Sequence, residues 1–185
     1  SLLMYWFLRR LTGEQTGSIV GSLVGALTWA YGGFMTGYPP LQLALLEAGI
    51  WLPLGVLDIL EATRRDYLRW TWLALSGFAL GLSWMAGHPQ TSWFLTYLLV
   101  AYLGYRVFEQ RRSWRVFVIG TVIMGVISGG MAAVQLLPGA EYLAHTARVD
   151  FSFDAKGNGF PYYDVAQVLF PGFLTLWSPL YFGIV

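Results

Sequence analysis

The stretch that decides the fold runs from Trp70 to Tyr105 and reads WTWLALSGFALGLSWMAGHPQTSWFLTYLLVAYLGY. It contains no charged residue, and it is too long for one helical crossing of the hydrocarbon core, which takes about 20 residues. Gly87-His88-Pro89-Gln90 lies near its middle. Gly suits the end of one helix, and Pro at the start of the next lacks only an N–H that would have no partner there. The stretch therefore predicts a transmembrane hairpin.

The composition of the whole chain agrees with a membrane environment. Of its 185 residues, 56% are hydrophobic and only 11% are charged, and the mean hydropathy is +0.55, far from the norm for soluble proteins. A net charge of +1 gives no reason to expect a nucleic-acid partner, so membrane lipids are the expected surroundings. Cysteine is absent, which excludes a disulfide framework and a thiolate metal site within this chain.

Working outward from the hairpin, the chain predicts an all-α, polytopic transmembrane helix bundle. Apolar runs at both ends, Ser1–Leu8 and Phe173–Val185, are too short to cross, so we expect both termini to be cut from a longer protein. Residues 1–185 are interpreted as a single transmembrane domain with an outer polar loop over 138–164. The five predicted full crossings are Gly17–Tyr38, Leu41–Leu60, Tyr67–Ala86, Pro89–Tyr105 and Trp114–Leu137.

The basic residues divide unevenly between the two sides of this predicted topology. Because each predicted crossing takes the chain to the other side of the membrane, one side holds only Arg148 and Lys156 of the basic residues, together with His88 and His145. The positive-inside rule makes the arginine-rich side cytoplasmic, so the histidines are expected on the outer side. The arginine-rich side holds Arg9, Arg10, Arg64, Arg65, Arg69, Arg106, Arg111, Arg112 and Arg115.

Small residues recur every fourth position in three predicted helices, at Gly17/Gly21/Gly25, Gly77/Gly81 and Gly125/Gly129. Such ridges let helix backbones approach closely. They serve either as a dimerisation motif or to join helices of the same chain, and we favour the second. We therefore expect Gly17, Gly21 and Gly25 to contact another helix instead of lipid.

Glu47 and Asp58 are the two carboxylates inside a predicted crossing. On one continuous helix they would share nearly the same face, about three turns apart. Ionisable groups at membrane depth usually face a bundle interior or an aqueous cavity, which makes Glu47 a functional candidate. The alternative, which we favour, is that Asp58 reaches the cytoplasmic surface and Glu47 lies near the outer headgroups.

Polar residues also gather on the predicted outer side. His88 and Gln90 lie in the hairpin turn, and Gln135 approaches the same level at the end of its helix. In one interpretation His88 binds a phosphate or metal, or shuttles a proton. In the other, which we favour, it only caps the turn by bonding free carbonyls. Glu141, His145 and Arg148 follow Pro138 at helical spacing and predict a short polar helix in the outer interface. Glu141 and His145 would supply two metal ligands without a third, so no metal site is assigned.

These motifs occur in a familiar order: Gly32-Gly33-Phe34-Met35, Ala86-Gly87-His88-Pro89-Gln90, Gln135-Leu136-Leu137-Pro138, Glu141 and Arg148, then Leu169-Phe170-Pro171 and Tyr181-Phe182-Gly183. This order resembles the bacterial YfhO-type membrane proteins, a family similar to the GT-C glycosyltransferases. The resemblance covers nearly the whole chain. It implies a multi-pass protein of the bacterial cytoplasmic (inner) membrane.

The resemblance implies transfer of a sugar from a polyprenyl phosphate at the outer face of that membrane. An acidic residue in the first external loop would act as base or ligand of a divalent metal ion, and that loop would precede Ser1. No catalytic residue is therefore assigned within this chain. The expected substrate-binding residues are His88, Gln90, Gln135, Glu141 and Arg148. The alternative function is that of a non-catalytic accessory or scaffold subunit bound to other membrane proteins; a transporter is a third.

Overall fold

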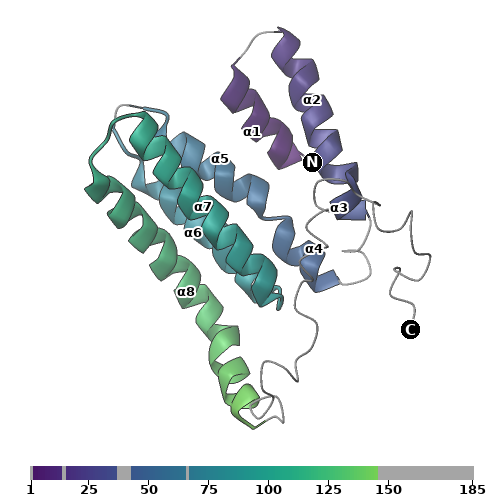
Figure 1. Ribbon diagram of the computed structural model, residues 1–185, viewed down its shortest axis with the longest axis vertical. Coiled ribbons are helices and arrows are strands. Elements are labelled where there is room, and N and C mark those ends of the chain that lie inside the picture. Colours follow the sequence, from purple (N-terminus) through teal and green to yellow (C-terminus); the bar gives the residue numbers. More distant parts are fainter. Residues whose placement is uncertain (1, 14–15, 37–42, 66, 146–185) are drawn as a thin grey trace, which may run out of the picture. The chain divides into compact units, whose positions relative to one another are not determined.

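The predicted hairpin lies at the centre of the structure, a computed structural model that describes residues 2–13, 16–36, 43–65 and 67–145. Helix α6 runs over Trp70–Met85 and helix α7 over Pro89–Glu109 (Figure 1). Gly87 between them has a φ of +80°, which glycine adopts without the strain that a Cβ would cause. The buried Ser92 hydroxyl donates to the Ser83 carbonyl at 2.9 Å and so ties α7 to α6. The two helices and the turn of the predicted hairpin are confirmed.

Helices are the only regular elements in the described part of the chain. The chain divides into two compact units, Ser1–Gly139 and Ala140–Val185. The all-α prediction is confirmed for the described residues. Besides α6 and α7, the helices are α1 (Leu2–Thr12), α2 (Thr16–Tyr31), α3 (Gly33–Thr36), α4 (Leu43–Gly49), α5 (Leu52–Thr63) and α8 (Trp114–Ala144).

Two segments are long and apolar enough to cross a membrane, judged by length and composition alone. They are Leu43–Thr63, which comprises α4 and α5, and Trp114–Tyr142 within α8. Gly17–Tyr31 is apolar but shorter. Five full crossings therefore stay a prediction, and the predicted span at Phe173–Val185 lies outside the described residues.

Several helix boundaries differ from those predicted. Helix α2 ends at Tyr31 instead of Tyr38, and α7 continues to Glu109 instead of ending at Tyr105. The expected crossing Leu41–Leu60 is divided at Ile50 and Trp51, because Pro53 in the first turn of α5 has no N–H to continue the ladder from α4. At the other end, α8 continues through Pro138 to Ala144, although we expected the helix to end at Leu137. A proline inside a long helix costs one hydrogen bond, and neighbouring turns can still hold the helix together.

Close helix contacts occur at some of the predicted glycine ridges and not at others. A Cβ at Gly77 of α6 would lie 2.9 Å from the Cα and carbonyl oxygen of Met124 in α8. Gly25 of α2 faces the Leu8 side chain of α1 in the same way. Gly17 and Gly21 are exposed and have no atom within 4 Å of a built Cβ, so our expectation for them was wrong in the described part of the chain.

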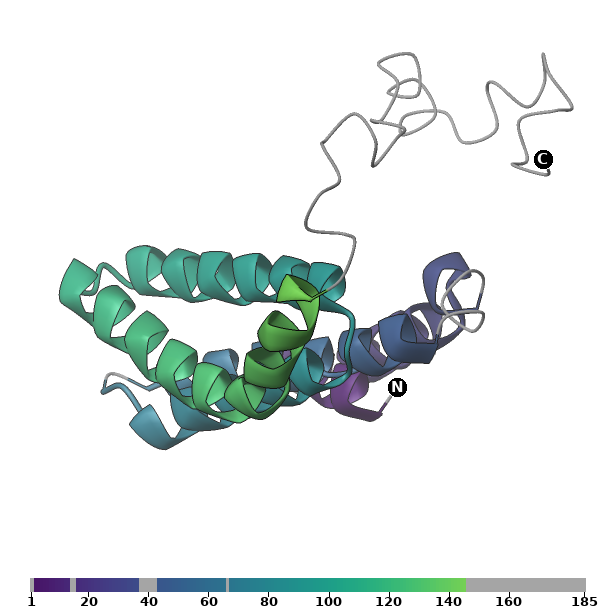
Figure 2. The same ribbon diagram turned by 90° about the horizontal axis from the view of Figure 1, so that it is seen from below.

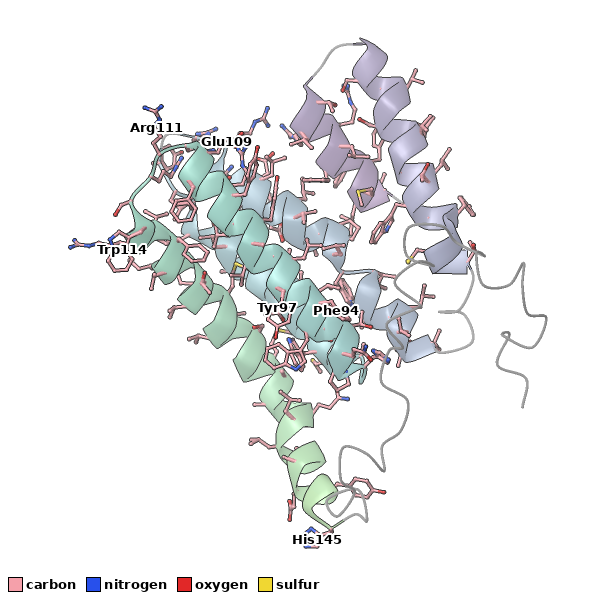
Figure 3. All side chains as sticks on the ribbon, in the orientation of Figure 1. Phe94, Tyr97, Glu109, Arg111, Trp114 and His145 are labelled. Atoms are coloured by element: carbon pink, nitrogen blue, oxygen red, sulfur yellow. The ribbon has the colours of Figure 1, made fainter. Side chains whose placement is uncertain are left out.

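Several of the predicted cytoplasmic arginines lie together at one end of the first unit, while the side of the membrane stays a prediction. Glu61 of α5 is 8% exposed, and its carboxylate lies 3.5 Å from Arg10, 3.3 Å from Arg64 and 3.6 Å from Arg69. Arg106 of α7 donates to the Thr63 hydroxyl of α5 at 3.2 Å. The C-terminal ends of α1, α5 and α7 and the N-terminal end of α6 therefore meet. Glu109, Arg111 and Trp114 are labelled at this end in Figure 3.

The contact at Gly77 predicts a sharp difference between two Gly→Ala variants. Gly77→Ala forces a methyl group against the Met124 backbone, which cannot move aside as a side chain would, and should cost about 1–3 kcal/mol. Gly21→Ala meets open space and should be neutral or stabilising by up to about 1 kcal/mol. Thermal unfolding in detergent measures both, and equal melting temperatures would contradict the close contact between α6 and α8.

Candidate functional site

The turn between α6 and α7 is built around His88, which precedes α7 as its N-cap. Its Nδ1 accepts a hydrogen bond from the Thr91 backbone N–H at 3.2 Å and lies 2.8 Å from the Thr91 hydroxyl. A ring nitrogen that accepts from a backbone N–H carries no proton, so the proton lies on Nε2. His88 thus caps the helix by accepting from an N–H, and not by bonding free carbonyls as we expected. It keeps an N–H donor that the cap does not use.

Helix α8 places Gln135 beside this turn. The Gln135 side-chain nitrogen lies 3.1 Å from the position that a Cβ on Gly87 would occupy. The absence of a side chain at Gly87 therefore lets α8 approach the hairpin. His88 and Gln135 are both half-buried, whereas Gln90, on the first turn of α7, is exposed. Gln135 therefore lies beside Gly87 of the turn, and its expected meeting with His88 and Gln90 stays a prediction.

The other predicted site residues belong to the second unit or lie outside the described residues. Glu141 is exposed in the last turns of α8, and the His145 Nδ1 lies 2.9 Å from the Glu141 carbonyl oxygen. Arg148, like most of the predicted outer loop, lies outside the described residues. No cluster of three or more His, Cys, Asp or Glu side chains that could hold a metal ion occurs in the described ranges.

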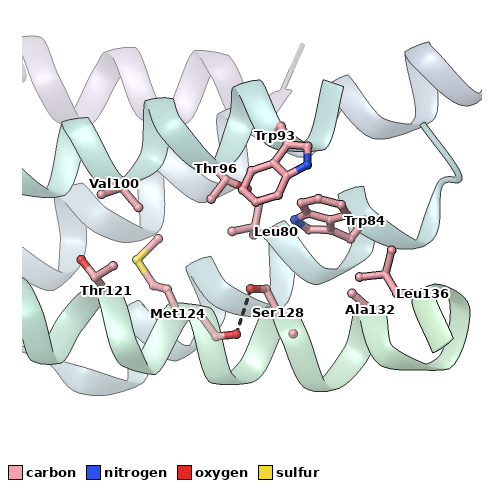
Figure 4. A pocket seen from close by; sticks show the side chains of 12 residues that line it. Leu80, Trp84, Trp93, Thr96, Val100, Thr121, Met124, Ser128, Ala132 and Leu136 are labelled. Carbon is pink, nitrogen blue, oxygen red and sulfur yellow. Dashed lines mark hydrogen bonds between the residues drawn. The ribbon is translucent and has the colours of Figure 1, made fainter. Parts of the chain in front are cut away.

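A cavity of about 280 Å³ lies between α6, α7 and α8 (Figure 4). Its wall is almost entirely apolar, and no sequence pattern indicated it. The cavity extends from Thr121 and Val100 to Trp84, Trp93 and Leu136, and Leu136 directly follows Gln135. The cavity therefore ends close to the hairpin turn, although His88, Gln90 and Gln135 are not among the residues that line it.

Aromatic rings form the wall near that turn. Trp84 of α6 and Trp93 of α7 meet edge to face, with ring centroids 5.2 Å apart. Trp93 also stacks on Tyr97 at 5.7 Å. Trp and Tyr rings concentrate where hydrocarbon meets headgroups, because one part of each ring is apolar and another can bond to water. The cavity end at Trp84 and Trp93 has the character of a membrane interface.

The two carboxylates of the predicted polar helix face are separated by the break between α4 and α5. Asp58 is 1% exposed, and neither of its carboxyl oxygens has a hydrogen-bond partner among the described residues. Our favoured expectation that Asp58 reaches the surface was therefore wrong. Glu47 is exposed. Glu47 lies in α4 and Asp58 in α5, on either side of the interruption at Ile50 and Trp51.

No family model, no curated protein and no solved structure matches this chain. The YfhO-type resemblance is therefore neither supported nor contradicted by known proteins.

The cap at His88 can be tested by its contribution to stability. His88→Ala removes the acceptor for the Thr91 N–H and should lower the free energy of unfolding by about 1 kcal/mol. His88→Asn should recover most of that loss, because Asn is a favoured N-cap residue. The exposed Gln90→Ala serves as the control and should change little. An unchanged melting temperature for His88→Ala would contradict the cap.

Proposed function

We propose that this chain is part of a GT-C-like membrane glycosyltransferase that takes its sugar from a polyprenyl phosphate at the outer face of the bacterial inner membrane. The observation that carries the proposal is the apolar cavity between α6, α7 and α8, which ends beside the polar turn at His88 and Gln135. A prenyl phosphate is itself divided in this way, since its tail is apolar and its head is anionic. The proposed site therefore suits an amphipathic ligand.

The groups at the turn have defined roles in this proposal. The Nε2–H of His88 and the amide of Gln135 donate hydrogen bonds to phosphate oxygens, which accept strongly because they are charged. Trp84 and Trp93 contact the first part of the prenyl chain. The role that the resemblance implies for Arg148 in phosphate binding stays a prediction, because Arg148 lies outside the described residues. The described residues offer no metal site, so we derive no metal-dependent step from them.

The alternative is a non-catalytic accessory or scaffold subunit, and one observation favours it. One face of α2 presents exposed apolar side chains beside the exposed Gly17 and Gly21, and nothing in the described residues of the first unit covers them. A partner helix could approach closely there. These apolar side chains are Ile19, Val20, Leu23, Val24 and Leu27.

The proposed topology predicts opposite labelling of two introduced cysteines. Residues 1–185 contain no native cysteine, so each substitution introduces the single thiol of this chain, and the protein without either substitution gives the background signal. In intact cells, Gln90→Cys should react with a membrane-impermeant maleimide, and Arg111→Cys should react only after the membrane is opened. Both positions are exposed, so access to reagent decides the result. Labelling of both positions from the same side would overturn the topology.

The cavity predicts different effects for two neighbouring Gly→Leu variants of α8. Gly129 lines the cavity and Gly130 does not, while a Cβ at either position meets no atom within 4 Å. Gly129→Leu should displace about two methylene groups of a bound chain, worth about 0.8 kcal/mol each, and weaken binding of the lipid-linked donor roughly tenfold. Gly130→Leu should leave donor affinity unchanged.

The complete protein in nanodiscs, titrated with a fluorescent polyprenyl-phosphate sugar, measures these affinities. Melting temperatures of the two variants should agree, since both exchange glycine for the same helix-forming residue. If Gly129→Leu binds donor as well as the unchanged protein does, the cavity is not the donor site. Co-purification of a partner that depends on Gly21, without donor binding, would then support the accessory subunit.

A further inference from the structure

A second cavity, of about 460 Å³, lies at the arginine-rich end of the first unit. Its wall is mostly polar and is formed by Thr63, Arg64, Arg65, Gln110 and Arg112. It lies where the C-terminal end of α5 meets the loop between α7 and α8. Figure 2 shows α7 and α8 joined at that loop. The cavity is distinct from the one proposed to hold the donor, which is lined by α6, α7 and α8.

Neutral groups hold Arg112 in place in this cavity. Its Nε donates to the Gln110 side-chain oxygen at 2.7 Å, and its Nη2 donates to the carbonyl oxygens of Thr63, at 3.4 Å, and Arg65. Gln110 in turn donates to the Thr63 carbonyl at 2.8 Å. These acceptors orient the guanidinium without neutralising its charge. A cation fixed in this way needs little further ordering to bind an anion.

The positive charge around the cavity exceeds the negative charge near it. Arg64 pairs with Glu61, but that one carboxylate is shared with Arg10 and Arg69. Arg65 donates to the neutral Tyr67 hydroxyl at 2.9 Å. Counted from the sequence alone, the predicted cytoplasmic side has nine arginines and five acidic residues, namely Glu14, Asp58, Glu61, Asp66 and Glu109.

The cavity lies at the end of one candidate span and at the start of the other. Thr63 is the last residue of the span Leu43–Thr63, and Arg112 lies just before Trp114, where the second span begins. Tyr67, Trp70 and Trp114 at the same end are exposed by 59%, 43% and 63%. Exposed Trp and Tyr rings at span ends are typical of the headgroup region. An anion at this depth is most readily supplied by a lipid.

We propose that this cavity binds the phosphate of an anionic phospholipid headgroup in the cytoplasmic leaflet. Arg64, Arg65 and Arg112 supply the charge, and guanidinium groups bind phosphate oxygens in pairs. Basic pockets between membrane helices on the cytoplasmic side bind lipid headgroups by this chemistry. The inference rests on the membrane placement in the proposed function, but it does not depend on sugar transfer.

The test compares two double variants that remove the same charge. Arg64→Gln/Arg65→Gln alters the cavity wall, whereas Arg111→Gln/Arg115→Gln removes two exposed arginines from the same end outside it. The complete protein in a neutral detergent is titrated with phosphatidylglycerol, phosphatidylcholine or inorganic phosphate, and its melting temperature is followed. Arg112 is left unchanged because it also holds the end of α5.

We expect phosphatidylglycerol alone to raise the melting temperature of the unchanged protein, because a ligand that binds the folded state stabilises it. Arg64→Gln/Arg65→Gln should bind this lipid about thirtyfold more weakly than the unchanged protein does. The affinity of Arg111→Gln/Arg115→Gln should stay within about threefold of that of the unchanged protein. An equal loss of lipid affinity in both double variants would show that diffuse electrostatic attraction, and not this cavity, holds the lipid. Equal stabilisation by phosphatidylcholine, or by inorganic phosphate, would overturn the assignment to an anionic lipid.

Loss of this binding is distinguishable from failure of the proposed function. Donor binding is measured at the opposite end of the hairpin with a different ligand, and sidedness is measured by cysteine labelling. Lipid binding that persists in a protein without donor binding supports the headgroup site and leaves the donor site refuted. Donor binding without any response to phosphatidylglycerol refutes the headgroup site alone.

Discussion

The α6–α7 hairpin fixes the register on which the other contacts of the first unit depend. Its turn is closed by Gly87 at positive φ, by the cap at His88 and by the Ser92–Ser83 hydrogen bond. In an apolar environment such polar groups must find partners within the protein, so the turn cannot slide by a residue without leaving a donor unpaired. With the turn fixed, the last residues of α7 reach the end of α5, where Gln110 bonds to Thr63. The hairpin thus links two ends of the unit.

The two ends of the hairpin use different chemistry for a physical reason. At the arginine-rich end, charged groups compensate one another only in part, which suits a position in contact with water and anionic lipid. At the turn, the polar groups of His88, Thr91 and Gln135 are neutral and half-buried or buried. Neutral donors can be withdrawn from water at lower cost than a charge, and they can still bind an anion that arrives with its own lipid tail.

Much of the helical order was predictable, and the misses have identifiable causes. The uncharged run with Gly87 and Pro89 at its middle predicted the hairpin, because both residues act on the local backbone. Crossing parity grouped the arginines correctly for Arg10, Arg64, Arg69 and Arg106. The burial of Asp58 could not be read from spacing, since it depends on which helices cover α5. The cavity was equally hidden, because it arises from the angle between helices and not from any motif.

The apolar cavity follows from how α8 approaches its two neighbours. Near the loop, a Cβ at Gly120 of α8 would lie 3.0 Å from Leu103 of α7, and on the other side Gly77 of α6 touches the Met124 backbone. Farther along α8, Gly125 and Gly129 line the cavity, and no atom lies within 4 Å of a built Cβ at either. The same small residues thus have opposite effects: in α6, glycine brings two backbones together, whereas on the α7-facing side of α8 it leaves space. Larger side chains at Gly125 and Gly129 would close that space. A cavity in such a bundle can therefore arise where glycines leave space that side chains would fill. The Trp84–Trp93 pair and the turn lie at the end of this space.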